Sequence, residues 1–244
     1  RTAPGTRFWY GVAASADGTK MAAAPSYAAI YTSADSGATW TARTASGSRS
    51  WTSIASSSDG GKLAAVGLSI AVYTSADSGA TWTARTASGT RDWKKIASSA
   101  DGVKLVAAPS GATLYTSADS GATWTSRTAS GSRSWTAVAS SSDGVNLVAT
   151  ADAGYIYTSA DSGATWTERT TSGSRAWRNV ASSADGVNLV ASVDSGYIYV
   201  SADSGATWTE RTAAGSRVWM ALASSSTGAK LVAGNDGGYL YTSP

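Results

Sequence analysis

The octapeptide Ser33-Ala34-Asp35-Ser36-Gly37-Ala38-Thr39-Trp40 recurs four more times, and each copy follows the previous one by 42 residues. All copies keep the pattern S-x-D-x-G-x-T-W; the others are Ser75–Trp82, Ser117–Trp124, Ser159–Trp166 and Ser201–Trp208. A fixed period of this length indicates a repeat architecture, in which each unit buries its apolar face against its neighbours.

The octapeptide itself has the chemistry of a stapled β-turn. Tyr31-Thr32-Ser33 and Thr39-Trp40-Thr41 favour strands, and Asp-Ser-Gly lies between them. An aspartate in such a turn accepts backbone N–H bonds, and glycine tolerates a positive φ. We therefore predict a scaffold role for the aspartates at the third position, which are Asp35, Asp77, Asp119, Asp161 and Asp203.

The whole repeat predicts four short strands and no helix. In the second repeat the expected strands are Trp51–Ser56, Lys62–Val66, a third one ending at Tyr73, and Thr81–Arg85. Asp59-Gly60 is a turn signal between the first two. The dense Gly, Ser and Thr leave no 3.6-residue apolar period. Four strands per unit of about 40 residues is the pattern of a propeller blade.

The octapeptide resembles the Asp-box, or bacterial neuraminidase repeat, at all of its defining positions. This motif belongs to β-propellers of sialidases, sortilin-like receptors, glucan hydrolases and photosystem II assembly factors. The resemblance implies an all-β, six-bladed β-propeller. Residues 1–244 would then form one domain of six tandem 42-residue repeats.

The last repeat is incomplete in this sequence. It reaches Tyr241-Thr242-Ser243-Pro244, where a sixth octapeptide would continue, while Arg1–Arg7 aligns with Arg43–Arg49 near the end of a fourth strand. Three interpretations stay open: a three-stranded last blade, a fragment, or part of a larger ring.

The composition limits the chemistry that this chain can perform. It contains no Cys and no His, which removes thiolate ligands, disulfides and the commonest general base and metal ligand. We expect no metal and no cofactor. The net charge of +3 is carried without basic blocks, so we expect no nucleic-acid partner. No apolar run is long enough for membrane insertion, and the composition suggests a secreted or cell-surface protein.

An enzyme is the least favoured hypothesis. The sialidase resemblance would imply an arginine triad, a Tyr–Glu nucleophile pair and an acidic proton donor, but the only glutamates are Glu168 and Glu210 in fourth strands. The aspartates outside recurrent turns are Asp92, Asp152, Asp194 and Asp236. Glycosidases need two differently tuned carboxyls close together, and these residues are too repetitive for that. We predict no catalytic residue.

From the positions that differ between repeats we predict a face of the propeller that binds a ligand. They flank the first-strand tryptophan and fill the loop between strands two and three, and we expect both zones on the face opposite the octapeptides. Each repeat also places an Arg two residues before that Trp there. The candidate ligand-binding pairs are Arg7/Trp9, Arg49/Trp51, Arg91/Trp93, Arg133/Trp135, Arg175/Trp177 and Arg217/Trp219, joined in the last three repeats by Asp152/Tyr155, Asp194/Tyr197 and Asp236/Tyr239.

Two functions fit these candidates. The first is a non-catalytic, multivalent, lectin-like propeller that binds glycans or glycoconjugates. In such a site the arginine guanidinium groups donate hydrogen bonds to sugar hydroxyls, and the C–H faces of the sugar stack on the indole rings. The alternative is an assembly scaffold that binds another protein and has no small-molecule site. In that case the tryptophans fill the gaps between blades, and the arginines cap loop carbonyls or stack on a ring.

Overall fold

The computed structural model describes residues 5–243. The chain divides into two compact units, and their boundary lies within the third repeat. Unit 1 comprises residues 1–110 and 115–126, and unit 2 comprises residues 111–114 and 127–244. The aligned segment Arg1–Arg7 falls partly outside the described residues, so its predicted strand end is not placed.

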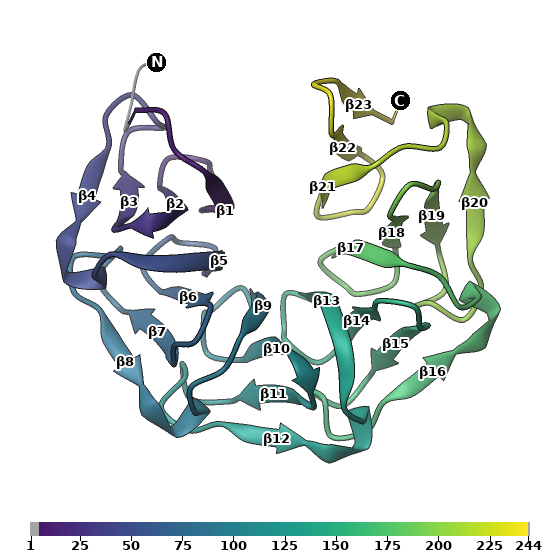
Figure 1. Cartoon of the computed structure of the whole chain (residues 1–244), viewed down its shortest axis with the longest axis horizontal. Coiled ribbons are helices and arrows are strands. Elements are labelled where there is room, and N and C mark those ends of the chain that lie inside the picture. The colour runs from purple at the N-terminus through teal and green to yellow at the C-terminus, as the bar shows by residue number, and fades with distance from the viewer. Residues whose placement is uncertain (1–4, 244) are drawn as a thin grey trace. The chain divides into compact units, whose positions relative to one another are not determined.

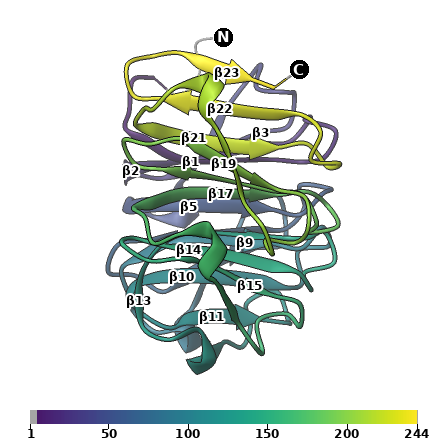
Figure 2. The same cartoon turned by 90° about the vertical axis from the view of Figure 1, so that its right-hand side faces the viewer.

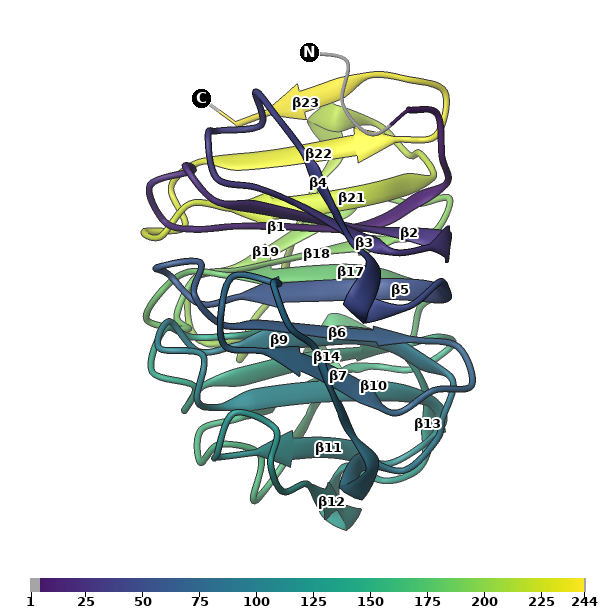
Figure 3. The same ribbon diagram turned by 90° about the vertical axis from the view of Figure 1, so that its left-hand side faces the viewer.

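Each repeat folds into an antiparallel meander, which we call a blade (Figure 1). The first three blades are β1 (Trp9–Ala14), β2 (Met21–Ala28), β3 (Ile30–Ser33) and β4 (Thr41–Arg43); β5 (Arg49–Ser56), β6 (Leu63–Gly67), β7 (Val72–Ser75) and β8 (Thr83–Arg85); and β9 (Trp93–Ser98), β10 (Leu105–Ala112), β11 (Leu114–Ser117) and β12 (Thr125–Arg127). Within unit 1, β1 lies against β5 (Figure 3).

The fourth and fifth blades follow the same order, and the sixth has three strands in the described residues. They are β13 (Arg133–Ser140), β14 (Leu147–Ala151), β15 (Ile156–Ser159) and β16 (Thr167–Arg169); β17 (Trp177–Ser182), β18 (Leu189–Val193), β19 (Ile198–Ser201) and β20 (Thr209–Arg211); and β21 (Trp219–Ser224), β22 (Leu231–Asn235) and β23 (Leu240–Thr242). Within unit 2, β21 stacks on β17 (Figure 2).

The predicted strands are confirmed, although their bounds shift; in the second repeat the first strand begins earlier, at Arg49, the second strand is shifted by one residue to Leu63–Gly67, and the fourth begins later, at Thr83. The third strand does not end at its tyrosine but continues for two residues, because Thr32 and Ser33 still pair with Ala22 and Met21. The expectation of no helix is also wrong in detail, since a short 3₁₀ turn follows each fourth strand. These turns are Thr44–Ser46, Thr86–Ser88, Thr128–Ser130, Thr170–Ser172 and Thr212–Ala214. None of the described helical segments is long and apolar enough to cross a membrane.

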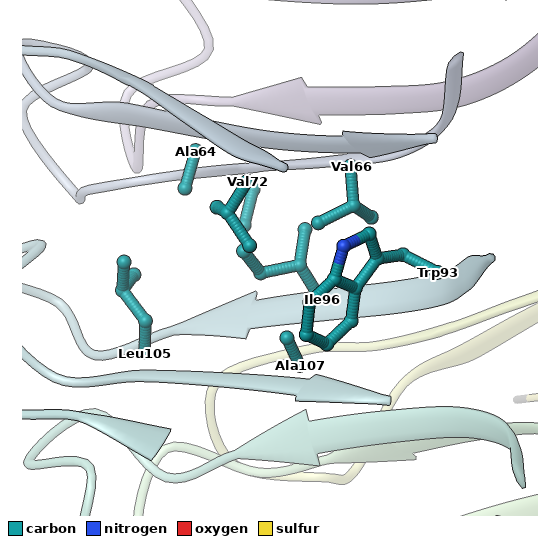
Figure 4. Packing of buried hydrophobic residues seen from close by; sticks show 8 residues of the cluster. Ala64, Val66, Val72, Trp93, Ile96, Leu105 and Ala107 are labelled. Atoms are coloured by element: carbon teal, nitrogen blue, oxygen red, sulfur yellow. The ribbon is translucent and has the colours of Figure 1, made fainter. Parts of the chain in front are cut away.

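The core lies at the seams, by which we mean the interfaces between successive blades. At the seam of the second and third blades, the Trp93 ring lies between Val66 of one blade and Ala107 of the other (Figure 4). Ile96 and Leu105 extend the same cluster. A flat indole and alanine-rich second strands allow the two sheets to approach closely, which explains the alternation of large and small residues.

The octapeptides form the predicted turns. In the first copy, Asp35 Oδ1 accepts from Thr39 N at 2.8 Å and Asp35 Oδ2 accepts from Thr39 Oγ1 at 2.6 Å, while Ser33 Oγ donates to the same carboxylate. Gly37 has a φ of 79°. The hydrogen bond from the Thr39 side chain, followed by that from its backbone, lowers the pKa of Asp35 to about 2. The same contacts recur in the other four copies, so the turn prediction is confirmed.

Candidate functional site

The first-strand tryptophans lie inside the seams. Trp51, Trp93 and Trp219 are 0% exposed, and Trp135 and Trp177 are 1% exposed; Trp9 alone is partly exposed. The indole N–H groups of the five buried rings are also satisfied, for example by Trp93 Nε1 donating to Ile70 O at 2.9 Å. Five of the six indoles therefore offer no ring face on which a sugar could stack in this structure.

The candidate arginines contact tyrosines and not the tryptophans with which they were paired. The Arg49 guanidinium lies 4.5 Å from the centroid of Tyr73, and the Tyr73 ring meets Trp51 edge-on at 5.4 Å. Arg49 Nε also donates to the carbonyl of Ser46 at 3.1 Å. Each repeat thus contains an Arg–Tyr–Trp stack whose arginine covers a ring, and in the second to sixth repeats the arginine also caps a loop carbonyl. The other arginines stacked in this way are Arg7, Arg91, Arg133, Arg175 and Arg217.

Two of these stacks end in a glutamate. Tyr157 Oη donates to Glu168 at 2.6 Å, and Arg133 lies 3.7 Å from the same carboxylate. In the fifth blade, the Tyr199 hydroxyl donates to Glu210 in the same way. Burial, reinforced by this hydrogen bond, raises the pKa of Tyr199 to about 12. These two glutamates therefore serve as acceptors for tyrosine hydroxyls, and each belongs to a separate blade.

The predicted convergence of the two variable zones is confirmed. In unit 1, Ile70 from the loop between β6 and β7 exchanges backbone hydrogen bonds with Arg91, which precedes β9. In unit 2, Gly154 pairs in the same way with Arg175. The octapeptides lie at the other end of the strands, where Ser78 N donates to Gly61 O in the turn between β5 and β6. We call the first of these ends the loop face.

A β-bulge presents one of the variable residues of each repeat on the loop face. The strand register shifts immediately after the first-strand tryptophan, as between Trp177 and Asn179. A bulge leaves its extra residue unpaired and re-aims its side chain. The bulged residues are Tyr10, Thr52, Lys94, Thr136, Arg178 and Met220.

In unit 2 two of the bulged side chains, those of Arg178 and Met220, lie together beside Asp194. Arg178 Nη1 donates to Asp194 Oδ1 at 3.0 Å, and Arg178 Nη2 lies 3.1 Å from the Met220 sulfur of the next blade. The ion pair is part-exposed, with 34% of the Arg178 side chain and 46% of the Asp194 side chain accessible. Asp194 is thus held by Arg178, a contact between two residues that both vary among the repeats.

The remaining candidates surround this cluster without joining it. Asp152 and Asp236 are exposed, whereas Tyr155 and Tyr197 are partly buried against their blades. Tyr239 is exposed, and its backbone N–H donates to Asn235 Oδ1 at 3.0 Å. The acidic and aromatic residues of the last three repeats therefore share the loop face but not one pocket.

Unit 1 carries exposed aromatic side chains in the first blade. Phe8, the single phenylalanine of the chain, is 77% exposed, and Tyr27 is 81% exposed. Their segments adjoin, because Ser26 N donates to Phe8 O at 2.9 Å. The bulged Tyr10 is also exposed. We call Phe8, Tyr10 and Tyr27 the aromatic patch.

Sequence reasoning missed two features of the site. The third-strand tyrosines stack with the arginines, which the recurrence of Tyr31 and its counterparts could have signalled. The bulge could not be read from composition. Lys95, whose pKa is lowered by burial, replaces small residues such as Ser53 and Ala137 in the first strands. No group of three or more acidic side chains able to hold a metal is present among residues 5–243.

Comparison with solved structures places the fold. YCF48 from Cyanidioschyzon merolae superposes with a TM-score of 0.71 at 15% identity, over 97% of this chain and 81% of that protein. YCF48 bound to a D1 peptide gives a TM-score of 0.74 at 18% identity, over 98% and 78%. The GH74 xyloglucanase from Xanthomonas campestris gives a TM-score of 0.72 at 17% identity, over 97% of this chain but only 44% of the enzyme.

The fold is that of a β-propeller. At these identities the likeness concerns the fold alone, and the matched proteins include both a peptide-bound YCF48 and glycoside hydrolases. No protein-family model and no curated protein sequence matches the chain.

Proposed function

We propose that this protein is a non-catalytic propeller of the Asp-box type that binds another protein through the loop face of unit 1. The aromatic patch carries the proposal. Protein interfaces are enriched in exposed aromatic residues and arginine, and such side chains dominate binding energies when they become buried. Phe8 is 77% exposed among the described residues, and a partner on this face would remove its ring from water.

The rigidity of the loop face supports the same function. The Arg–Tyr–Trp stacks and the backbone bridges hold the loops before any partner arrives. Binding to a preorganised surface costs little ordering entropy. Repeat-specific side chains at the bulges then supply specificity, while the shared residues serve the scaffold. The structural likeness to YCF48 bound to a D1 peptide agrees with a peptide or protein ligand.

Glycan binding is the second candidate. The observation in its favour is that Arg49, Arg91, Arg175 and Arg217 use Nε for the loop carbonyl and leave their Nη groups without a hydrogen bond to described residues. In unit 2 the free forks belong to Arg175, which pairs with the loop of Asp152, and to Arg217, which pairs with the loop of Asp194, so each would offer donors to sugar hydroxyls beside a carboxylate. The burial of the indoles argues against it, because it removes the stacking half of the predicted site.

A hydrolytic function has less support. The glycoside hydrolase resemblance covers less than half of those enzymes. Glu168 and Glu210 each bind a tyrosine hydroxyl, and neither forms a pair with a second carboxyl in the described contacts. A glycosidase mechanism needs two carboxyls about 5–10 Å apart across a substrate.

The test compares two libraries on the same immobilised chain. Random peptides displayed on phage and a glycan array are each applied to the parent and to a Phe8→Ser/Tyr10→Ser/Tyr27→Ser variant. We expect enriched peptides that bind the parent and lose at least tenfold in affinity on the variant, with no glycan above background. The matched control is Tyr239→Ser, an exposed tyrosine outside the patch. Glycan binding that survives the triple substitution and falls with Arg175→Ala would favour the lectin hypothesis instead.

A further inference from the structure

The seam of the fourth and fifth blades contains a small cavity at its octapeptide end. The cavity has a volume of about 130 Å³, and its walls include Asn146 and Arg169 of the fourth blade and Gly186 and Leu189 of the fifth. All of these residues belong to unit 2, and both blades have four strands. Pockets for drug-sized ligands measure ~300–1,000 Å³, so this cavity fits an occupant of only a few atoms.

The same place at the seam of the first and second blades, within unit 1, is almost filled. The space there is about 10 Å³. Each residue of its wall has a counterpart three repeats later in the wall of the larger cavity. Among these shared positions the residue type differs at two, where Lys20 and Met21 correspond to Asn146 and Leu147. The larger volume therefore accompanies the replacement of a lysine by a shorter side chain.

Lysine stems cover the turn of the following blade in unit 1. A methyl group on Gly60 would lie 2.7 Å from Lys20 Cβ and 2.8 Å from Lys20 Cδ. Lys62 lies in the same way on Gly102, with both of these distances at 2.8 Å. In both places the glycine leaves room for the methylene groups of the lysine.

The charge of each lysine acts on the aspartate of the turn that it covers. Hydrogen bonds within the turn, first that from Ser57, lower the pKa of Asp59, and the Lys20 charge lowers it further. The pKa of Asp101 is lowered by its turn and by Lys62 in the same order. A lysine at this position thus places methylene groups on a glycine and a positive charge near a carboxylate.

Asn146 reaches the turn of the fifth blade with a shorter, uncharged side chain. Its Nδ2 donates to Asp185 O at 2.9 Å, and its Cγ would lie 3.1 Å from a methyl group on Gly186. Hydrogen bonds from Ser183 and from Val187 N lower the pKa of Asp185, and no described lysine adds to them. This turn therefore offers the glycine and the carboxylate without the methylene chain and the positive charge.

We propose that the cavity binds an alkylammonium group, with its methylene carbons on Gly186 and its nitrogen near the Asp185 carboxylate. The chemistry follows from equivalence, because Lys20 and Lys62 supply those same groups at the seams of unit 1. Hydrogen bonds between an ammonium and a carboxylate are among the stronger ones in proteins. Asp185 Oδ2 accepts from no described residue, so it is available to an ammonium donor.

The positive charge of Arg169 is compatible with a cation in this cavity. Its counterpart Arg43 shares a seam with Lys20, and the two arginines make the same contact. Arg43 Nε donates to Thr32 Oγ1 at 2.6 Å, and Arg169 Nε donates to Thr158 Oγ1 at 2.7 Å. Exposed aspartates at the octapeptide end of the fourth and fifth blades also attract cations. These aspartates are Asp143, Asp161, Asp185 and Asp203.

The proposal does not depend on protein binding at the aromatic patch. The cavity lies in unit 2 at the octapeptide end of the strands, whereas the patch lies on the loop face of unit 1. Variants of one site can therefore be scored without changing the other.

The experiment adds n-propylamine to the 244-residue chain labelled with ¹³C at its leucine and valine methyl groups. At about pH 7 the amine is protonated, as a lysine side chain is. We expect saturable shifts of the methyl signals of Leu147 and Leu189, which line the cavity. n-Propanol, which has the same length and no charge, should bind at least about tenfold more weakly.

Two reciprocal substitutions test the equivalence with unit 1. Asn146→Lys brings an ammonium into the cavity from the chain itself, so the shifts caused by the amine should disappear. Lys20→Asn should create a second site at the seam of the first and second blades, reported by the methyl signals of Leu63. In Lys20→Asn the shifts at Leu189 should match those of the parent.

The carboxylate is tested with a matched pair of variants. Asp185→Asn keeps an oxygen acceptor in the turn but removes its charge, and it should weaken amine binding at least about fivefold. Asp101→Asn is the control, because Asp101 occupies the same position of a unit 1 turn that Lys62 covers. It should leave amine binding within about twofold of the parent, as expected for an independent site.

No methyl shift in the parent, equal binding of amine and alcohol, or shifts that survive Asn146→Lys would each overturn the proposal. Binding of inorganic phosphate that is lost in Arg169→Gln would assign the cavity to an anion and overturn the choice of ligand. Nα-acetyl-lysine N-methylamide identifies the source of the alkylammonium group. Binding as tight as that of n-propylamine assigns the site to a lysine of another polypeptide, and weaker binding assigns it to a free amine.

Discussion

The seams on either side of the fifth blade are built from the same repeat but are packed differently. At the seam of blades four and five, an octapeptide turn and its tryptophan fill the space between the sheets, and about 130 Å³ remains. At the seam of blades five and six the first-strand tryptophan is equally buried, yet about 690 Å³ remains. The difference teaches that the tryptophan of the first strand anchors a seam, while the octapeptide of the fourth strand completes it.

Removing an anchor should have the largest effect. Trp177→Ala deletes a 1% exposed indole that packs on both Tyr199 and Trp208, and we expect it to lower the free energy of unfolding by about 3–5 kcal/mol. Trp219→Ala should fall at the lower end of that range, because among the described residues its ring packs on Tyr241 but on no octapeptide tryptophan. Urea unfolding followed by circular dichroism measures both. An equal or larger loss for Trp219→Ala would contradict the comparison.

Filling the space between the sheets should change the stability of the protein in opposite directions at the two seams. Ala233 lines the large cavity, and Ala233→Leu should stabilise the protein by about 0.5–2 kcal/mol. Its counterpart Ala191 is 0% exposed in the completed seam, so Ala191→Leu should overpack the core and cost about 1–3 kcal/mol. Thermal melts of the two variants give the signs, and two changes of the same sign would refute the distinction.

A smaller effect concerns the arginine at the end of the fourth strand. Arg169 Nε donates to Thr158 Oγ1 at 2.7 Å, but Arg211 has Val200 at the threonine position. Thr158→Val should cost about 0.5–1.5 kcal/mol, the usual net value of a hydrogen bond. Val200→Thr should restore the bond and stabilise the protein by less than that. A stabilising Thr158→Val would show that this hydrogen bond contributes nothing to the seam.

The smallest effect is a pH dependence from the exposed octapeptide carboxylates. Hydrogen bonds from the Thr207 side chain and backbone lower the pKa of Asp203 from 3.8 to about 2. Between these values the unfolded chain binds more protons than the folded one, so stability is present above pH 4 and declines as the pH falls towards 2. Melting temperatures of the parent should drop over this interval. The drop should be smaller in Asp203→Asn, and an identical drop in both would contradict the assignment.

Much of the fold could be predicted because the strands and turns of each repeat depend on interactions between residues that are close in the sequence. The spacing of Trp51, Asp59-Gly60, Tyr73 and the octapeptide located four strands, and the carboxylate of Asp77 was correctly assigned to its turn. The 3₁₀ turns were missed because Thr86-Ala87-Ser88 has no apolar period and is stabilised by tertiary contacts, such as Ser88 Oγ accepting from Val72 N.

The candidate site was predicted less well. The sequence placed both variable zones on one face, and the bridge between Ile70 and Arg91 confirms it. It could not show that Arg49 would cover Tyr73 and leave Trp51 to the core, because Arg and Trp are neighbours in the chain whereas Tyr73 is brought in by the meander. Glycan binding, the secreted or cell-surface location and the single six-repeat domain stay predictions.

By itself the sequence determined the period, the strands and the turns, since these depend on interactions within a few residues of each octapeptide. Tertiary structure alone decided which aromatic residues are buried and which are exposed. Trp93 and Phe8 are both large rings near a first strand, but a neighbouring blade covers one, and the other is 77% exposed. Burial depends on what packs against a residue from elsewhere in the chain, and no local pattern encodes that neighbour.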